Sequence, residues 1–99
     1  MKPRKLADLD RFFAHSTRHL GMALAKRAGK GSHWSYGLRT ADGRKICSLV
    51  LKIGKKEVSP GVLRNLATAL RAQRERCSDA ETLALLDRFI EAYERWLRT

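Results

Sequence analysis

Large apolar residues alternate with small or polar ones along the middle of the chain, which is the pattern of a half-buried β-strand. Residues 32–40 and 44–53 both show this alternation. The Asp42-Gly43 pair between them is a hairpin signal, because glycine adopts positive φ angles without steric penalty. One face of the predicted hairpin is apolar and consists of Trp34, Tyr36, Leu38, Cys47, Leu49, Leu51 and Ile53. We therefore predict two antiparallel strands with one buried face.

Before this hairpin the apolar spacing changes to three, four and seven, which is typical of an amphipathic helix. We predict this helix over residues 2–19, because Pro3 suits a first helical turn and Gly21 a helix end. Residues 22–28 lie between two glycines and are short for a helix, although their composition favours one. A third strand is the prediction for this segment.

Two more helices are predicted after the hairpin. Ser59 and Pro60 suit the N-cap and the first position of a helix. Ser78 and Glu81 fit a capping box that begins another helix. This last helix carries a wide apolar stripe that consists of Leu83, Leu86, Phe89, Ile90, Tyr93, Trp96 and Leu97. Such a stripe packs either on the domain itself or against a partner chain.

The predicted order is helix, three strands, helix, helix, which makes an α+β fold with a three-stranded antiparallel sheet. Helices would cover one face of the sheet and leave the other open. The open face would carry His33, Ser35, Arg39 and Lys52. We predict that residues 1–76 form a basic domain, and that residues 77–99 form an additional helix that packs on this domain or on a partner.

Positive charge is concentrated in the first part of this 99-residue chain. Its 21 basic and 10 acidic residues give a net charge of +11. Residues 1–56 contain 14 basic and 3 acidic residues, whereas residues 57–99 contain 7 of each. A bias that served solubility alone would not segregate in this way. The distribution predicts a polyanionic partner, either a nucleic acid or an acidic protein.

The remaining composition points to a soluble cytoplasmic protein. Cys47 lies in an apolar run and Cys77 far from it, so neither is in metal-ligand spacing, and a buried free thiol fits a reducing compartment. No apolar run approaches the roughly 20 residues of a membrane span, and the basic N-terminus lacks the apolar core of a signal peptide. We expect no membrane association and no cofactor.

Several short motifs occur in an order that resembles the HicA-type toxins of bacterial toxin–antitoxin pairs. They are Gly31-Ser32-His33, the hairpin, Gly54-Lys55-Lys56-Glu57, and the helix start Pro60-Gly61-Val62-Leu63-Arg64-Asn65-Leu66. The resemblance covers roughly residues 5–74. It implies a double-stranded-RNA-binding-like fold, translation-independent cleavage of messenger RNA, and an antitoxin that blocks the active site. The chain departs from the family in a longer, alanine-rich segment before Gly29 and in the helix after Ser78.

His33 corresponds to the catalytic histidine of that family, and strand alternation independently places it on the open face. An imidazole with a pKa near neutrality can accept the proton of a ribose 2′-OH that attacks the adjacent phosphate. Lys30 and Arg39 could stabilise the charge that develops on the phosphoryl oxygens. No carboxylate cluster flanks His33, so we expect a ribonuclease that uses no metal. The alternative is a surface histidine that only contacts phosphate.

The candidate RNA-binding residues are mostly basic and comprise Lys26, Arg27, Lys30, Ser32, Arg39, Lys45, Lys52, Lys55 and Lys56. Trp34 and Tyr36 could stack on bases, but their alternation favours the core. His15 and His19 are spaced i, i+4 and lack a third ligand, so we expect no metal site there.

The last helix is the candidate for protein contact, because its charge has the wrong sign for phosphate. Its outer apolar residues, Tyr93, Trp96 and Leu97, would contact a second copy of the chain or a different protein. A non-catalytic module of the same fold is the alternative to a toxin. Such a module would bind nucleic acid or block an acidic protein surface, as a phage-type inhibitor does.

Overall fold

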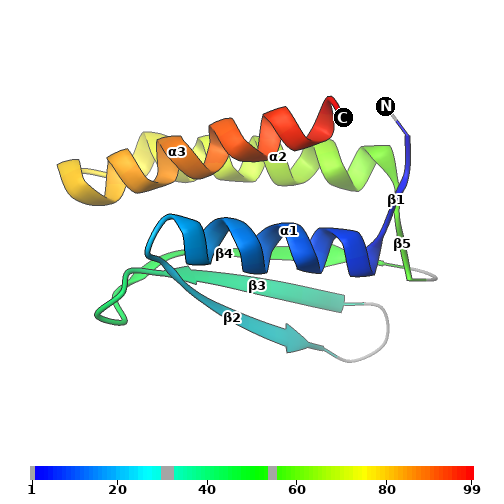
Figure 1. Ribbon diagram of the computed structural model, residues 1–99, viewed down its shortest axis with the longest axis horizontal. Helices are drawn as coiled ribbons and strands as arrows, with labels where there is room; N and C mark the ends of the chain where they lie inside the picture. The colour runs from blue at the N-terminus through cyan, green and yellow to red at the C-terminus, as the bar shows by residue number, and fades with distance from the viewer. Residues whose placement is uncertain (1, 30–32, 54–55) are drawn as a thin grey trace.

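The computed structural model describes residues 2–29, 33–53 and 56–99, which form an α+β fold (Figure 1). The elements in chain order are β1 (Arg4–Lys5), α1 (Leu6–His19), β2 (Ala23–Ala28), β3 (His33–Arg39), β4 (Lys45–Lys52), β5 (Glu57–Val58), α2 (Pro60–Arg76) and α3 (Ala80–Leu97). The three helices and the three-stranded sheet predicted from the sequence are all present. None of the helices in the described part of the chain is long and apolar enough to cross a membrane.

The main sheet is antiparallel, with the strand order β2-β3-β4. The predicted hairpin is confirmed by its register, in which Tyr36 pairs with Leu49 and Leu38 with Cys47. Gly43 takes the positive φ of 92° that the turn between β3 and β4 requires. The assignment of the segment after Gly21 to a strand is confirmed as well, since β2 pairs with β3 along its whole length.

All three helices lie on the same side of this sheet (Figure 1). Helix α1 contacts β2, and α2 contacts β4. Helix α3 packs against both of these helices and lies beside α2 (Figure 1). In the described structure no helix covers the opposite face of the sheet, which we call the open face (Figure 1).

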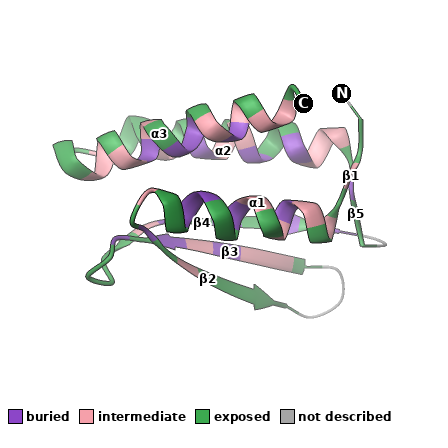
Figure 2. Cartoon of the chain, in the orientation of Figure 1, coloured by how far each residue is buried: buried purple, intermediate pink, exposed green. Residues whose placement is uncertain are grey.

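Aromatic side chains join the sheet to the helices in one core. The ring of Phe13 on α1 stacks on Tyr36 of β3, with centroids 4.1 Å apart. Phe89 of α3 then meets the edge of Phe13 at 5.2 Å. Tyr36, Phe13 and Phe89 are fully buried. Buried residues follow the inner side of every helix in Figure 2, so α3 contributes to the same core as the sheet.

Tyr93 belongs to this core, and its predicted role as an outer contact residue is therefore wrong for this chain on its own. Its side chain is fully buried, and its hydroxyl donates a hydrogen bond to the carbonyl oxygen of Leu63 at 2.7 Å. The apolar stripe of α3 is wide because one side of it meets α1 and another meets α2. The sequence pattern shows the width of such a stripe but not the number of neighbouring helices.

The start of the first helix differs from the prediction. Residues 4 and 5 form β1, which pairs with β5 in a separate two-stranded sheet, and the helix begins at Leu6. The amide of Leu6 donates to the carbonyl oxygen of Lys56 at 2.9 Å. Pro3 therefore precedes a strand rather than a first helical turn. A strand of two residues has no periodicity that a sequence pattern could reveal.

The helix caps follow the prediction at α2 and differ at α3. The side chain of Ser59 accepts a hydrogen bond from the amide of Val62 at 3.3 Å, as expected for an N-cap. At α3 the cap is Asp79 instead of Ser78, because its carboxylate accepts bonds from the amide of Thr82 at 2.9 Å and from its hydroxyl at 2.6 Å. These bonds lower the pKa of Asp79. Aspartate and serine are both preferred N-cap residues, so the sequence pattern alone does not distinguish Ser78 from Asp79. Asp79 is the cap because its carboxylate bonds both the amide and the hydroxyl of Thr82.

Candidate nucleic-acid interface

The strands of the main sheet carry only positive charge. Strands β2, β3 and β4 contain Lys26, Arg27, Arg39, Lys45 and Lys52 and no aspartate or glutamate. Cross-strand register assigns each of these residues to one of the two faces and to one end of the sheet. The open face is thus a candidate surface for a polyanion, and its two ends differ in composition.

One end of the open face places His33 between two cations. His33 and Lys52 are direct cross-strand partners, and Arg27 is the partner of Ser35. His33 and Ser35 are two residues apart and so share a face, which makes Arg27 a diagonal neighbour of His33 at about 7 Å. The side chains of His33, Arg27 and Lys52 are exposed. We call these three residues the His33 group.

The backbone holds this group in place at the end of the sheet. The amide of Gly29 donates to the carbonyl oxygen of His33 at 2.9 Å, which extends the pairing of β2 and β3 beyond Ala28. The hydroxyl of Ser35 is 3.5 Å from the carbonyl oxygen of Arg27. Among the described residues no carboxylate forms an ion pair with Arg27 or Lys52, so both positive charges are available to a ligand.

Arg39 lies too far from His33 to act in the same site, which corrects the prediction that it stabilises charge there. The two residues are at opposite ends of the seven-residue strand β3, roughly 20 Å apart at about 3.3 Å per residue. Arg39 pairs across the strands with Lys45, and its guanidinium donates to the carbonyl oxygen of Gly43 at 3.1 Å. Arg39 can contact a phosphate only at a second point along the open face. Its pairing with Lys45 follows an irregularity in the register, and Lys45 lines a hollow with Gln73 and Arg76 of α2.

Lys26 is on the helix-covered face of the sheet, so the structure does not bring it together with the His33 group on the open face. Its cross-strand partner is the buried Tyr36, and its ammonium nitrogen is 3.6 Å from a carboxylate oxygen of Asp10 on α1. Tyr36 donates a hydrogen bond to the same carboxylate. Burial, and then the carboxylate of Asp10, raise the pKa of Tyr36. The sequence pattern gave no indication of Asp10, because its partners are distant in sequence.

Three predicted contact residues, Lys30, Ser32 and Lys55, lie outside the described residues. Lys56 is described and exposed, and its carbonyl oxygen accepts the bond from Leu6 at the start of α1. Lys56 therefore lies in the connector before β5 rather than on a strand of the open face.

The middle of the open face carries small side chains. Ala25, Gly37 and Ser48 form one cross-strand row, next to Val50, which is 69% exposed. Small side chains let a sugar–phosphate backbone approach the sheet closely. The two aromatic residues of the strands, Trp34 and Tyr36, are on the helix-covered face, as predicted, so they cannot stack on bases at the open face.

The remaining candidate residues lie away from this face. His15 and His19 have their rings 6.3 Å apart on α1. Among the described residues, no group of three or more His, Cys, Asp or Glu side chains is arranged to hold a metal ion. Trp96 is half-buried between Phe12, at 5.1 Å, and the guanidinium of Arg4, at 4.4 Å. Leu97 is half-buried at the end of α3.

Comparisons with known proteins add no assignment, since no family model, curated protein or solved structure matches this chain.

Proposed function

We propose that this protein binds RNA on its open face and cleaves it without a metal ion, in the manner of the HicA-type toxins that its motifs resemble. The observation that carries the proposal is the His33 group, an exposed imidazole flanked by Arg27 and Lys52 on a sheet face without acidic residues. The order α1, β2, β3, β4, α2 supports it, because it is the order expected for a double-stranded-RNA-binding-like fold.

In the proposed reaction, His33 accepts the proton of a ribose 2′-OH. The resulting oxygen attacks the adjacent phosphorus, a 2′,3′-cyclic phosphate forms, and the bond to the 5′-oxygen breaks. The leaving oxygen takes a proton from water. Lys52 and Arg27 stabilise the additional negative charge on the phosphoryl oxygens in the transition state.

A non-catalytic binding module is the second candidate, and one observation favours it. In the described structure no side chain forms a hydrogen bond with the imidazole of His33, whereas catalytic bases are normally oriented by a partner. Such a module would use the same surface to bind nucleic acid or to cover an acidic protein.

Cleavage in the presence of EDTA separates the two candidates. We expect the wild type to cleave RNA, and His33→Ala to reduce the rate by about a hundredfold or more with RNA affinity nearly unchanged. His19→Ala, which replaces an exposed histidine on α1, is the matched control and should cleave normally. An RNA-binding wild type without cleavage would favour the binding module. Equal cleavage by wild type and His33→Ala, or a requirement for magnesium, would remove His33 from the role of base.

The binding surface is tested by the salt dependence of RNA affinity. Arg27→Gln with Lys52→Gln should lower the slope of log affinity against log salt by roughly 1.5, because two phosphate contacts are lost. Arg18→Gln with Arg88→Gln removes the same charge from exposed positions on α1 and α3, and should leave the slope nearly unchanged. Equal changes of the slope in the two double variants would show that RNA affinity depends on net charge and not on these positions.

A further inference from the structure

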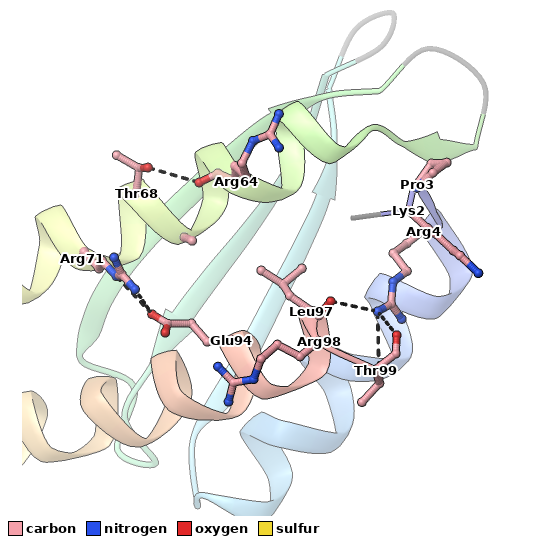
Figure 3. A pocket seen from close by; sticks show the side chains of 11 residues that line it. Lys2, Pro3, Arg4, Arg64, Thr68, Arg71, Glu94, Leu97, Arg98 and Thr99 are labelled. Carbon is pink, nitrogen blue, oxygen red and sulfur yellow. Dashed lines mark hydrogen bonds and ion pairs between the residues drawn. The ribbon is translucent and has the colours of Figure 1, made fainter.

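A hollow lies between α2, α3 and the segment that precedes α1, on the helical side of the molecule (Figure 3). Its volume is about 900 Å³, which is within the usual range of ligand sites. Cations from all three segments line it, namely Lys2, Arg4, Arg64, Arg71 and Arg98, together with one acidic residue, Glu94. Three of these cations belong to residues 57–99, which carry no net charge as a whole.

Two of the five cations already have partners in the structure. Arg71 on α2 donates from its Nε atom to the carboxylate of Glu94 on α3 at 3.1 Å. Arg4 donates to the carbonyl oxygens of Trp96 at 2.8 Å and Thr99 at 3.0 Å, where it satisfies the end of α3. Both arginines therefore hold the walls of the hollow together (Figure 3).

The other three cations have no acidic partner. In residues 2–29, 33–53 and 56–99, no carboxylate forms an ion pair with Lys2, Arg64 or Arg98. Each comes from a different segment, and all three line the same hollow. Like charges around a shared hollow repel one another, so this arrangement favours a ligand that brings negative charge.

The residues at the floor of the hollow indicate whether a nucleic acid or an acidic peptide fits it better. Ala67 and Leu97 are half-buried and give it an aliphatic lining, and none of its lining residues is aromatic. A sugar–phosphate backbone would pair with the cations of the rim but would leave the aliphatic floor without an apolar partner. A peptide that carries carboxylates around an aliphatic side chain matches both the rim and the floor.

We propose that this hollow binds an acidic segment of a partner protein. Carboxylates of the segment pair with Lys2, Arg64 and Arg98, and an aliphatic side chain between them contacts Leu97 and Ala67. Helices α2 and α3 lie on the opposite side of the sheet from the open face, so the segment and RNA would bind to different sides of the molecule (Figure 1). The proposal does not depend on RNA binding or cleavage.

Fluorescence anisotropy of the full chain with a short labelled peptide of Asp, Glu and Leu tests this site. Arg64→Gln with Arg98→Gln should weaken peptide binding by about tenfold, as expected for the loss of two exposed ion pairs. Arg18→Gln with Arg88→Gln removes equal charge from outside the hollow and should change binding less than about twofold. Thr68→Glu, at an exposed lining position, adds a repelling carboxylate and should also weaken binding.

The same variants also test the alternatives. A peptide with Gln and Asn in place of its acidic residues should not bind, and RNA affinity should be equal in the two double variants. Absence of peptide binding at low salt, or equal loss in both double variants, would overturn the proposal. A selective loss of RNA binding in the hollow variant would instead make the hollow a nucleic-acid site.

Discussion

The two faces of β3 differ in almost every physical property, although their residues alternate along one seven-residue strand. On the helix-covered face, Tyr36 and Leu38 are fully buried, and Tyr36 stacks on Phe13. On the open face, His33 and Arg39 are exposed, and small residues lie between them. One face therefore contributes most of the stability while the other is free to bind. Substitutions on the helix-covered face should lower the free energy of unfolding, whereas substitutions on the open face should change ligand binding and leave stability nearly unchanged.

The largest effect is expected in the core. Phe89→Ala removes a fully buried ring that contacts Phe13 and Phe12, so the free energy of unfolding should fall by about 3 to 5 kcal/mol. Urea denaturation followed by circular dichroism measures this change. Val50→Ala, on the open face, is the control and should change it by no more than about 0.5 kcal/mol. Similar losses for the two variants would contradict the division between the faces.

The next effect should appear at alkaline pH. Burial raises the pKa of the Cys47 thiol from 9.0 to about 11. Because the folded-state pKa is the higher one, this stabilisation is complete below about pH 9 and is lost as the pH rises to about 11, by roughly 2 kcal/mol. The raised pKa values of Tyr36 and Tyr93 add a further loss above pH 10.

The pH dependence of unfolding in urea measures this loss. Cys47→Ala lowers stability at every pH but should show a flatter pH dependence in this interval, since the titrating group is absent. Terms common to both proteins, such as lysine titration, cancel in the comparison. Equal pH slopes for wild type and Cys47→Ala would show that the thiol does not titrate in this way.

A smaller loss should follow removal of one buried hydroxyl. Tyr93→Phe retains the ring but leaves the carbonyl oxygen of Leu63 without its 2.7 Å side-chain bond, which should cost about 1 kcal/mol in the free energy of unfolding. RNA affinity should not change, because Tyr93 is remote from the open face. A thermal melt with an unchanged midpoint would show that the bond contributes nothing.

The smallest effect on stability is expected on the open face, where binding should change instead. Val50→Glu places a carboxylate beside the His33 group and should weaken RNA binding several-fold, with the free energy of unfolding within about 0.5 kcal/mol of wild type. Ala84→Glu makes the same change in net charge at an exposed position on α3. Filter binding should distinguish the two variants, and equal affinities would argue against the open face as the RNA surface.

Local periodicity was sufficient to predict much of the fold. The alternation around Tyr36 identified the buried and open faces of β3, because the side chains of a strand alternate regardless of what packs on it. The glycines around β2 identified a strand that composition alone would have made a helix. His33 was expected to face outward and is exposed for the same reason.

The parts that were missed depend on contacts between elements distant in sequence. Lys26 shares the helix-covered face with Leu24 by alternation along β2, and its ion pair with Asp10 of α1 depends on a contact that nothing near Lys26 in the chain indicates. Tyr93 is buried because α3 packs on two helices at once. Arg39 was assigned to the His33 group by its face, although the length of β3 places it at the far end of the sheet. The spacing of residues along a strand predicts which face a side chain occupies. Whether two side chains on one face form a site also depends on the distance between them.

The contact between Arg4 and the end of α3 has a consequence for the synthesis of the protein. It joins residues 92 to 95 positions apart, and the core below it needs Phe89 from the same helix. A ribosome-bound chain that ends before α3 already contains the whole sheet, but Phe12 and Phe13 lack their partners on that helix. Limited proteolysis of arrested nascent chains should therefore show protection of α1 only after α3 has left the ribosome. Until then the chain exposes aromatic surface to chaperones and proteases, so its survival depends on the completion of α3.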